Sequence, residues 1–163
     1  MRLPFFLLLS FFICSAQAQK APQFTLPDIN GDSVSLHDFK GKIIVVDFWV
    51  MWCETCREEI PKIHALHKKY SNRGVVVLGI HLGEKNAGKV KSFVKNAGIK
   101  YPVLLDPEEI TADQFAIQGT PSLVIVDTAG IIVKKYRELD KKTGKEVYGI
   151  LDSLAPIVPR LPE

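Results

Sequence analysis

The order of hydrophobic and polar positions predicts strands that alternate with helices along this chain. Residues 43–50 form a nearly continuous apolar run rich in β-branched side chains, which is typical of a strand buried on both faces of a sheet. After this run the period becomes helical, with apolar positions at Ile60, Ile63, Leu66 and Tyr70. We therefore predict a helix from Cys53 to about Tyr70, bent at Pro61, directly after a central strand.

Further elements follow from the same pattern. Residues 24–26 and 34–36 alternate around Asn30-Gly31, which predicts a β-hairpin because Asn-Gly supplies the positive φ angles of a tight turn. The remaining expected elements are strands over 75–82, 101–105, 122–126 and 131–136 and helices around 90–97 and over 110–117. Alternating strands and helices indicate the α/β class, and the closing hairpin over 122–136 indicates a mixed sheet.

The end of the chain is predicted to be one more helix followed by an extended tail. The apolar stripe of this helix consists of Val147, Ile150, Leu151 and Leu154. Thr143 and Glu146 have the spacing of a capping box, so the helix is expected to begin there. Prolines at positions 156, 159 and 162 predict a proline-rich tail from about residue 156.

The first residues have the pattern of a secretory signal. Arg2, an apolar run over residues 3–13 and the small-residue segment 15–18 predict a signal peptide, residues 1–18, cleaved after Ala18. The apolar run is shorter than the ~20 residues of a bilayer span, so an uncleaved anchor is the alternative. We expect residues 19–163 to form one domain in the periplasm or otherwise outside the cytoplasm, without stable membrane insertion after cleavage.

Composition constrains size and partners. The 163 residues are 47% hydrophobic, enough for one domain with a sizeable core. The net charge is only +3 and no basic run interleaves with aromatic residues, which argues against nucleic-acid binding. Cys14 lies in the signal segment, so the mature chain keeps Cys53 and Cys56, which form a disulfide or are poised to form one.

Cys53 and Cys56 stand where the central strand passes into the helix. Because the amides and the positive dipole end of a helix start stabilise a thiolate, Cys53 is expected to be exposed and reactive, with Cys56 one turn in and more covered. Glu54 acts in the opposite direction, since a nearby negative charge disfavours the thiolate. This arrangement indicates a redox dithiol.

Several motifs together resemble thioredoxin. They are Trp52-Cys53-Glu54-Thr55-Cys56 after a buried strand, Pro61 five residues beyond the second cysteine, and Thr120-Pro121 before a later strand. The leading hairpin, the segment Phe39-Lys40-Gly41-Lys42 and the extra helix around 90–97 are similar to the exported TlpA/ResA-like thiol-disulfide oxidoreductases. The resemblance covers about residues 21–155. It implies a thioredoxin-like fold, in which a mixed central sheet is flanked by helices, with an N-terminal β-hairpin and a central helical insertion.

The resemblance also implies an activity. Members of this family exchange disulfides with partner proteins outside the cytoplasm, often in support of cytochrome c maturation. The expected partners are therefore proteins with disulfides or thiols, including apocytochrome c, and a membrane electron donor, and we expect a monomer without cofactor or metal. A reductase is expected, but Thr55 replaces the proline that thioredoxin has between its cysteines, which leaves the direction open.

Residue roles follow from the same resemblance. Cys53 matches the nucleophile and Cys56 the resolving thiol, which breaks the mixed disulfide. Pro121 matches the family's cis-proline, and the backbone of Thr120 would then lie beside the cysteines, ready to pair with a substrate strand. Trp52, next to Cys53, can contact partners.

Two acidic residues are further candidates. Asp47 stands six residues before Cys53, where thioredoxin has a buried acid; in an apolar strand its pKa should be raised, and it could exchange a proton with Cys56. A satisfied polar group in the core is the alternative for Asp47. Glu84 resembles an acid that ResA-like proteins place near their active site, whereas the nearby His81 shows no partner pattern.

Other interpretations of the cysteine pair remain open. A peroxiredoxin-like thiol peroxidase requires a threonine three residues before its attacking cysteine, and Val50 stands there instead. A metal-binding or metallochaperone module would use Cys53 and Cys56, with His64 and His67 on the same helix, although a packed histidine is the simpler explanation of His67. A static structural disulfide is the third alternative.

Overall fold

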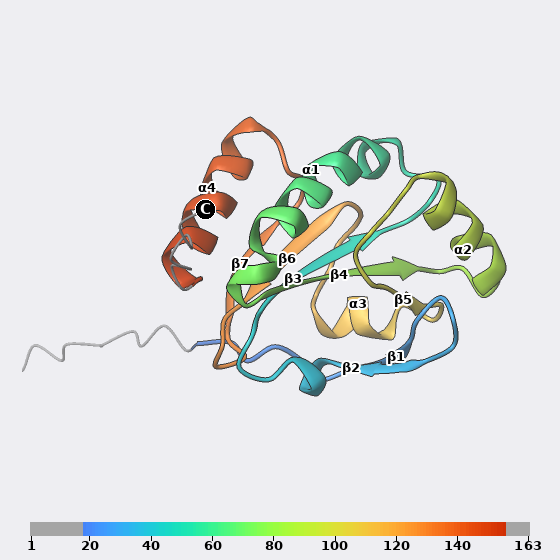
Figure 1. Ribbon diagram of the computed structural model, residues 1–163. Coiled ribbons are helices and arrows are strands. Elements are labelled where there is room, and N and C mark those ends of the chain that lie inside the picture. The colour runs from blue at the N-terminus through green and yellow to red at the C-terminus, as the bar shows by residue number, and fades with distance from the viewer. Residues whose placement is uncertain (1–17, 156–163) are drawn as a thin grey trace, which may run out of the picture.

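A five-stranded mixed β-sheet forms the centre of the protein. The computed structural model describes residues 18–155 and places helices on both sides of this sheet (Figure 1). In sheet order the strands are β5 (Val103–Asp106), β4 (Val75–Leu82), β3 (Ile43–Trp49), β6 (Ser122–Val126) and β7 (Ile132–Tyr136). β3 runs parallel to β4 and antiparallel to β6. The expected mixed sheet is therefore confirmed.

The central strand β3 is buried over its whole length because both faces of the sheet are covered. The helices are α1 (Glu54–Tyr70), α2 (Ala87–Asn96), α3 (Ile110–Gln114) and α4 (Lys141–Leu154). Val45 and Trp49 of β3 point into a core shared with α1, α2 and α4. Val46 and Phe48 point to the opposite face, into a core with α3 and the N-terminal hairpin. Figure 1 shows these layers, which follow from the alternation of side chains along a strand.

The N-terminal hairpin packs against the second of these cores. Its strands, β1 (Thr25–Pro27) and β2 (Ser33–Ser35), pair antiparallel and form a small sheet of their own. Gly31 in the turn has a φ of +94°, which glycine adopts at no steric cost. A short 3₁₀-helix, η1 (Leu36–Phe39), leads from β2 to β3, and a second, η2 (Ser71–Arg73), follows α1. The hairpin predicted around Asn30-Gly31 is confirmed.

Two element boundaries differ from the prediction. β5 begins at Val103, so Tyr101 precedes the strand, and its buried side chain belongs to the core under α1. α3 ends at Gln114, because Ala116 has a φ of +51°, which a continuing right-handed helix cannot contain. The other predicted strands and helices occur within a few residues of their expected ends.

The start of α4 contradicts the predicted capping box. The helix begins at Lys141, and its N-cap is Asp140, whose carboxylate accepts the N–H of Thr143 at 2.7 Å. Thr143 is therefore already inside the helix, and Glu146 instead accepts a hydrogen bond from the Tyr136 hydroxyl at 3.3 Å. The prediction was wrong because aspartate is at least as good an N-cap as threonine and stands three residues earlier.

The predicted signal peptide, except for its last residue, and the predicted proline-rich tail lie beyond the described residues 18–155. Within that range, no helix is both long and apolar enough to cross a bilayer.

Candidate active site

Cys53 and Cys56 lie at the start of α1, just after the central strand. Cys53 is the N-cap residue, and the N–H of Cys56 donates a hydrogen bond to its Sγ atom at 3.1 Å. The two side chains are joined as a disulfide, with Cα atoms 5.2 Å apart. Cys53 is partly exposed and Cys56 is buried. A helix-start amide and the positive end of the dipole therefore stabilise negative charge on the more accessible sulfur.

The loop before β6 passes beside Cys53. The Thr120–Pro121 peptide bond is cis, as predicted. The carbonyl oxygen of Thr120 lies 3.9 Å from the Sγ atom of Cys53. Pro121 is buried, whereas Thr120 is partly exposed. Backbone groups of Thr120 and the accessible sulfur therefore share one small surface.

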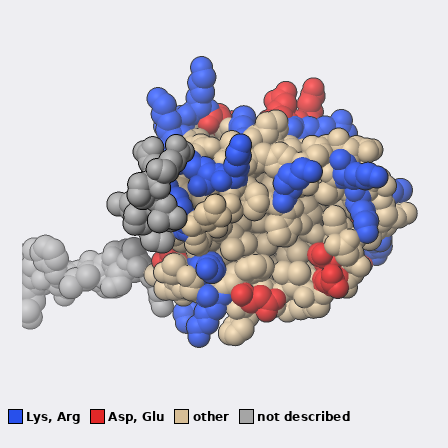
Figure 2. All heavy atoms as spheres, in the orientation of Figure 1, with Lys and Arg blue, Asp and Glu red and all other residues tan. Residues whose placement is uncertain are grey.

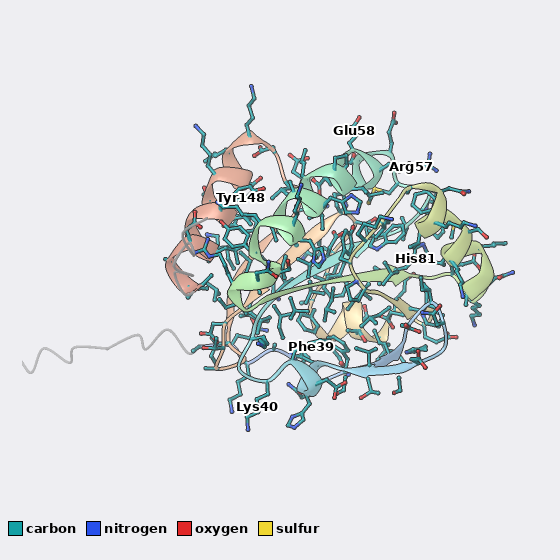
Figure 3. All side chains as sticks on the ribbon, in the orientation of Figure 1. Phe39, Lys40, Arg57, Glu58, His81 and Tyr148 are labelled. Carbon is teal, nitrogen blue, oxygen red and sulfur yellow. A yellow bond between two sulfur atoms is a disulfide. The ribbon has the colours of Figure 1, made fainter. Side chains whose placement is uncertain are left out.

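His81 connects the active-site loop to strand β4. Its Nε2 atom accepts the backbone N–H of Met51 at 3.1 Å. Its ring packs edge-on against Trp49 and Trp52, with centroids 4.8 and 5.9 Å away, and Trp52 is 61% exposed. Burial lowers the pKa of His81 to about 4, so the ring is neutral and Nε2 can accept. Figure 3 shows His81 toward the same end of the molecule as Arg57 in the first turn of α1.

The position of His81 was not foreseen from the sequence, although a signal for it existed. In the parallel pair of β3 and β4, His81 stands opposite Trp49. The carboxyl ends of neighbouring parallel strands meet at one edge of a sheet, where sites are commonly built. A residue at the end of β4 therefore had to lie near the loop that carries Cys53.

Asp47 lies in β3 on the face that α1 covers. It is 5% exposed, and the hydroxyl of Tyr101 donates a hydrogen bond to its Oδ2 atom at 3.4 Å. Burial, followed by the negative charge of Glu59, raises the pKa of Asp47 to about 7, against an opposing effect of the Tyr101 hydrogen bond. The raised pKa agrees with the expectation from sequence. A carboxyl that titrates near neutrality can accept and return a proton.

Glu59 belongs to the same buried region and was missed by the sequence reasoning. It lies one turn beyond Cys56 on the buried side of α1, and its Oε1 atom accepts the backbone N–H of Leu139. Burial raises the pKa of Glu59, and the hydrogen bond from Leu139 opposes this rise. The signal was its spacing of three residues from Cys56, which places both side chains on one face of a helix.

Glu84 makes its contacts at the start of α2. Its carboxylate accepts the N–H of Asn86 at 2.8 Å and pairs with Lys89 at 3.5 Å. The hydrogen bond from Asn86 is the main reason why the pKa of Glu84 is lowered. Glu84 follows His81 by three residues, and its part in substrate binding stays a prediction.

The helix histidines have packing partners. His64 accepts the N–H of Lys100 through Nε2 at 2.9 Å, and the rings of His64 and His67 both pack near Tyr101. Within residues 18–155, no group of three or more His, Cys, Asp or Glu side chains is arranged to hold a metal ion.

These features define a class. A dithiol at the start of a helix, directly after the central strand of a mixed sheet and beside a cis-proline loop, is the arrangement of a thiol-disulfide oxidoreductase of thioredoxin-like type. The chain belongs to the AhpC/TSA family, whose model matches residues 18–135.

Two relatives each match more than two thirds of this chain. The thiol-disulfide oxidoreductase ResA of Bacillus subtilis is 32% identical over 119 residues, which cover 73% of this chain and 66% of ResA. The thioredoxin-like protein YneN of the same organism is 34% identical over 117 residues, covering 71% and 68%. The chain thus spans about two thirds of the length of these two relatives.

Solved structures agree with the fold. A thiol:disulfide interchange protein of the thioredoxin family from Chlorobium tepidum superposes with a TM-score of 0.72 at 30% identity, covering 85% of this chain and 97% of that one. A thiol:disulfide interchange protein from Bacteroides sp. gives a TM-score of 0.74 at 28% identity, covering 89% and 93%.

Proposed function

We propose that this protein is an exported reductase that exchanges disulfides with partner proteins through Cys53 and Cys56. The observation that carries the proposal is the hydrogen bond from the N–H of Cys56 to Sγ of Cys53, at a partly exposed helix start beside the carbonyl of Thr120. The relatives' names, thiol-disulfide oxidoreductase and thiol:disulfide interchange protein, support the same chemistry. Val50, which has no hydroxyl, stands where a thiol peroxidase needs a threonine.

The proposed reaction has two exchange steps. The Cys53 thiolate attacks one sulfur of a partner disulfide, and the other partner sulfur leaves as a thiolate. Cys56 then gives its thiol proton to the Asp47 carboxylate and attacks Sγ of Cys53, so that the second partner sulfur leaves. The partner gains two electrons and becomes a dithiol, and Cys53 and Cys56 become a disulfide. A membrane electron donor returns the pair to the dithiol.

The groups around Cys53 are suited to a protein substrate. An extended segment of the partner can pair with the backbone of Thr120, next to Pro121, in the manner of an added strand. Trp52 offers an exposed aromatic surface, and Glu84 precedes α2, where its carboxylate accepts the N–H of Asn86. On the face shown in Figure 2, Lys and Arg side chains are spread out and form no single patch, which fits a protein better than a nucleic acid. Apocytochrome c is the substrate we propose.

The proposed location rests on the N-terminal pattern. Residues 1–18 would act as the signal, and residues 19–163 would be the mature domain, working as a monomer. Mass spectrometry of the exported protein should then find Gln19 at the mature N-terminus. A retained Met1 would support a membrane anchor instead.

A trapping experiment tests the roles of the two cysteines. In Cys56→Ser the first attack remains possible, but the mixed disulfide has no internal thiol to break it, so covalent partner complexes should accumulate. These complexes should appear on non-reducing gels of the exported fraction and disappear with reductant. Cys53→Ser is the matched control and should trap little, because Cys56 is buried.

The alternatives predict different results from the two mutants or from the wild type. A structural disulfide predicts that both variants lose stability similarly, by at most ~2–4 kcal/mol, and that neither traps partners. A metal site predicts equal loss of bound Zn²⁺ or Cu⁺ in both. A thiol peroxidase predicts turnover of hydrogen peroxide by the wild type. Any of these outcomes would overturn the proposed disulfide exchange.

A further inference from the structure

Two aromatic rings, those of Tyr101 and Trp49, pack over Gly79 in β4. Gly79 is the residue of β4 that stands opposite Asp47 in β3. A Cβ atom at this position would lie 2.9 Å from Cε2 of Tyr101 and 3.1 Å from Nε1 of Trp49, so the two rings occupy the space that a side chain would fill. The ring of Tyr101, which is 4% exposed, is thereby packed with its hydroxyl 3.4 Å from Oδ2 of Asp47.

We propose that Tyr101 is a positioning residue for the proton transfer from Cys56 to Asp47. Its hydroxyl holds the Asp47 carboxylate in place and stabilises the ionised form, which is the form that accepts the thiol proton. This inference deepens the proposed function and rests on Asp47 being the proton acceptor. Tyr101 acts only through Asp47 and keeps its own proton throughout.

The charges around Asp47 explain why such a donor matters. Glu59 faces Asp47 from α1, and its negative charge adds to the effect of burial against ionisation. The Tyr101 hydroxyl is the group that favours the ionised carboxylate, since it donates to it. The Tyr101 ring also packs near His64 and His67 of α1, with centroids 5.6 and 6.3 Å away. Burial and the two carboxyls raise the pKa of Tyr101, so it remains a donor at all working pH values.

One proton moves and one disulfide is exchanged in the step that Tyr101 assists. The proton of the Cys56 thiol passes to the Asp47 carboxylate, and the resulting thiolate attacks Sγ of Cys53. A sulfur–sulfur bond forms between the two cysteines, and the bond between Cys53 and the partner breaks. The electron pair of that bond leaves with the partner sulfur, so no further oxidant or reductant is required.

Tyr101→Phe tests the inference because it removes one oxygen atom and keeps the ring that packs over Gly79. The reduced protein is mixed with one equivalent of an aromatic disulfide whose thiol product is coloured. Release of the first coloured thiol reports attack by Cys53, and release of the second reports resolution by Cys56. In the wild type, the resolution rate should rise with pH as Asp47 ionises, with a midpoint near its pKa of about 7. In Tyr101→Phe this midpoint should move up by about 0.5–1 pH unit.

The chain offers a matched control for the loss of a buried hydroxyl. Tyr136 is also buried, and its hydroxyl donates to the carboxylate of Glu146 at 3.3 Å, in a pair formed by β7 and α4. Tyr136→Phe should leave the midpoint of resolution unchanged. Carboxyl NMR titration of Asp47 in the disulfide form gives a second readout, in which Tyr101→Phe should raise the Asp47 pKa without any cysteine chemistry.

Asp47→Asn, alone and combined with Tyr101→Phe, separates failure of this inference from failure of the proposed function. The measured quantity is the inflection in the resolution rate plotted against pH. If Asp47→Asn abolishes this inflection, and Tyr101→Phe no longer changes the pH profile of the rate in the Asp47→Asn background, Tyr101 acts through Asp47. If Asp47→Asn abolishes the inflection, but Tyr101→Phe as a single substitution leaves its midpoint at the wild-type pH, the inference is wrong and the proposed function stands. A shift that persists in the Asp47→Asn background also overturns the inference. An inflection that survives Asp47→Asn removes the proton role of Asp47, and the inference falls with it.

Discussion

The backbone N–H of Met51 points at the Nε2 atom of His81, 3.1 Å away, and this hydrogen bond ties the active-site loop to the end of β4. The carbonyl oxygen of the same residue accepts a hydrogen bond from Nε of Arg57 at 2.8 Å. Met51 is thus held from β4 and from α1, two residues before Cys53. The bond to His81 requires a neutral ring, because a protonated imidazole has no acceptor.

Replacing His81 with phenylalanine should destabilise the protein more at neutral pH than in acid. Phenylalanine keeps a ring beside Trp49 and Trp52 but leaves the Met51 N–H unpaired, which costs about 1–3 kcal/mol. The pKa of His81 is about 4 in the folded protein against 6.5 for an ordinary histidine. The contribution of His81 to wild-type stability should therefore fall as the pH drops from 6.5 to about 4, because the unfolded state takes up the proton first. Denaturant unfolding at both ends of this window measures the difference between the two proteins.

Two further observations make the His81 prediction specific. His37→Phe replaces an exposed histidine and should change the free energy of unfolding by no more than about 0.5 kcal/mol. The chain has two tryptophans, and both contact His81, so their fluorescence should titrate with His81 in the folded wild type and stay constant in His81→Phe. A stability loss that is equal at both pH values would show that His81 serves only as packing.

Asp47→Asn should make the protein more stable than the wild type at high pH. Burial raises the pKa of Asp47 from 3.8 to about 7, so the folded state binds a proton that the unfolded state has already released. The contribution of Asp47 to wild-type stability should therefore decline as the pH rises from 3.8 to about 7. Asparagine cannot ionise, so the variant should escape this decline and gain on the order of 2–4 kcal/mol relative to the wild type across the window. Thermal unfolding of both proteins across this pH range tests the prediction, because the stability difference between Asp47→Asn and the wild type should grow as the pH rises. A difference that stays constant with pH would contradict the raised pKa of Asp47.

Local patterns were sufficient to predict the elements of the fold and the cysteine pair. β4 and β6 have the predicted bounds, because an uninterrupted apolar run between turn residues has clear ends. Cys53 was recognised from the change of hydrophobic period beside it, and the cis bond before Pro121 from its motif. These signals all lie within a few residues of the feature that they predict.

The parts of the site that escaped prediction depend on contacts between distant segments. His81 and Met51 are 30 residues apart in sequence, and Tyr101 and Asp47 are 54 apart. The first contact arises from the register of β3 with β4. The second exists because Gly79 leaves space for a ring. Neither the register nor the space appears in a pattern read along one segment.

Trp52→Ala should weaken reaction with protein substrates and spare reaction with small ones. Trp52 is 61% exposed next to Cys53, so its indole has little core packing to lose and can cover part of a bound partner. A folded protein disulfide should therefore react about 10-fold more slowly with the variant, which corresponds to about 1.4 kcal/mol of lost contact. An aromatic disulfide of low molecular weight should react at a rate within about twofold of the wild type, because it needs only the Cys53 sulfur.

Ile110→Ala is the control that decides whether Trp52 acts by position or only by hydrophobicity. Ile110 is a large apolar side chain exposed to nearly the same extent, 58%, but it stands at the start of α3, on the opposite side of the sheet from α1. Loss of the Ile110 side chain should leave the reaction rates with both substrates, the protein disulfide and the aromatic disulfide, unchanged. If Ile110→Ala slowed the protein substrate as much as Trp52→Ala, general surface hydrophobicity would explain the effect. If Trp52→Ala slowed both substrates equally, the indole would act by holding Cys53 and its loop, together with His81, and would not be a contact for the partner.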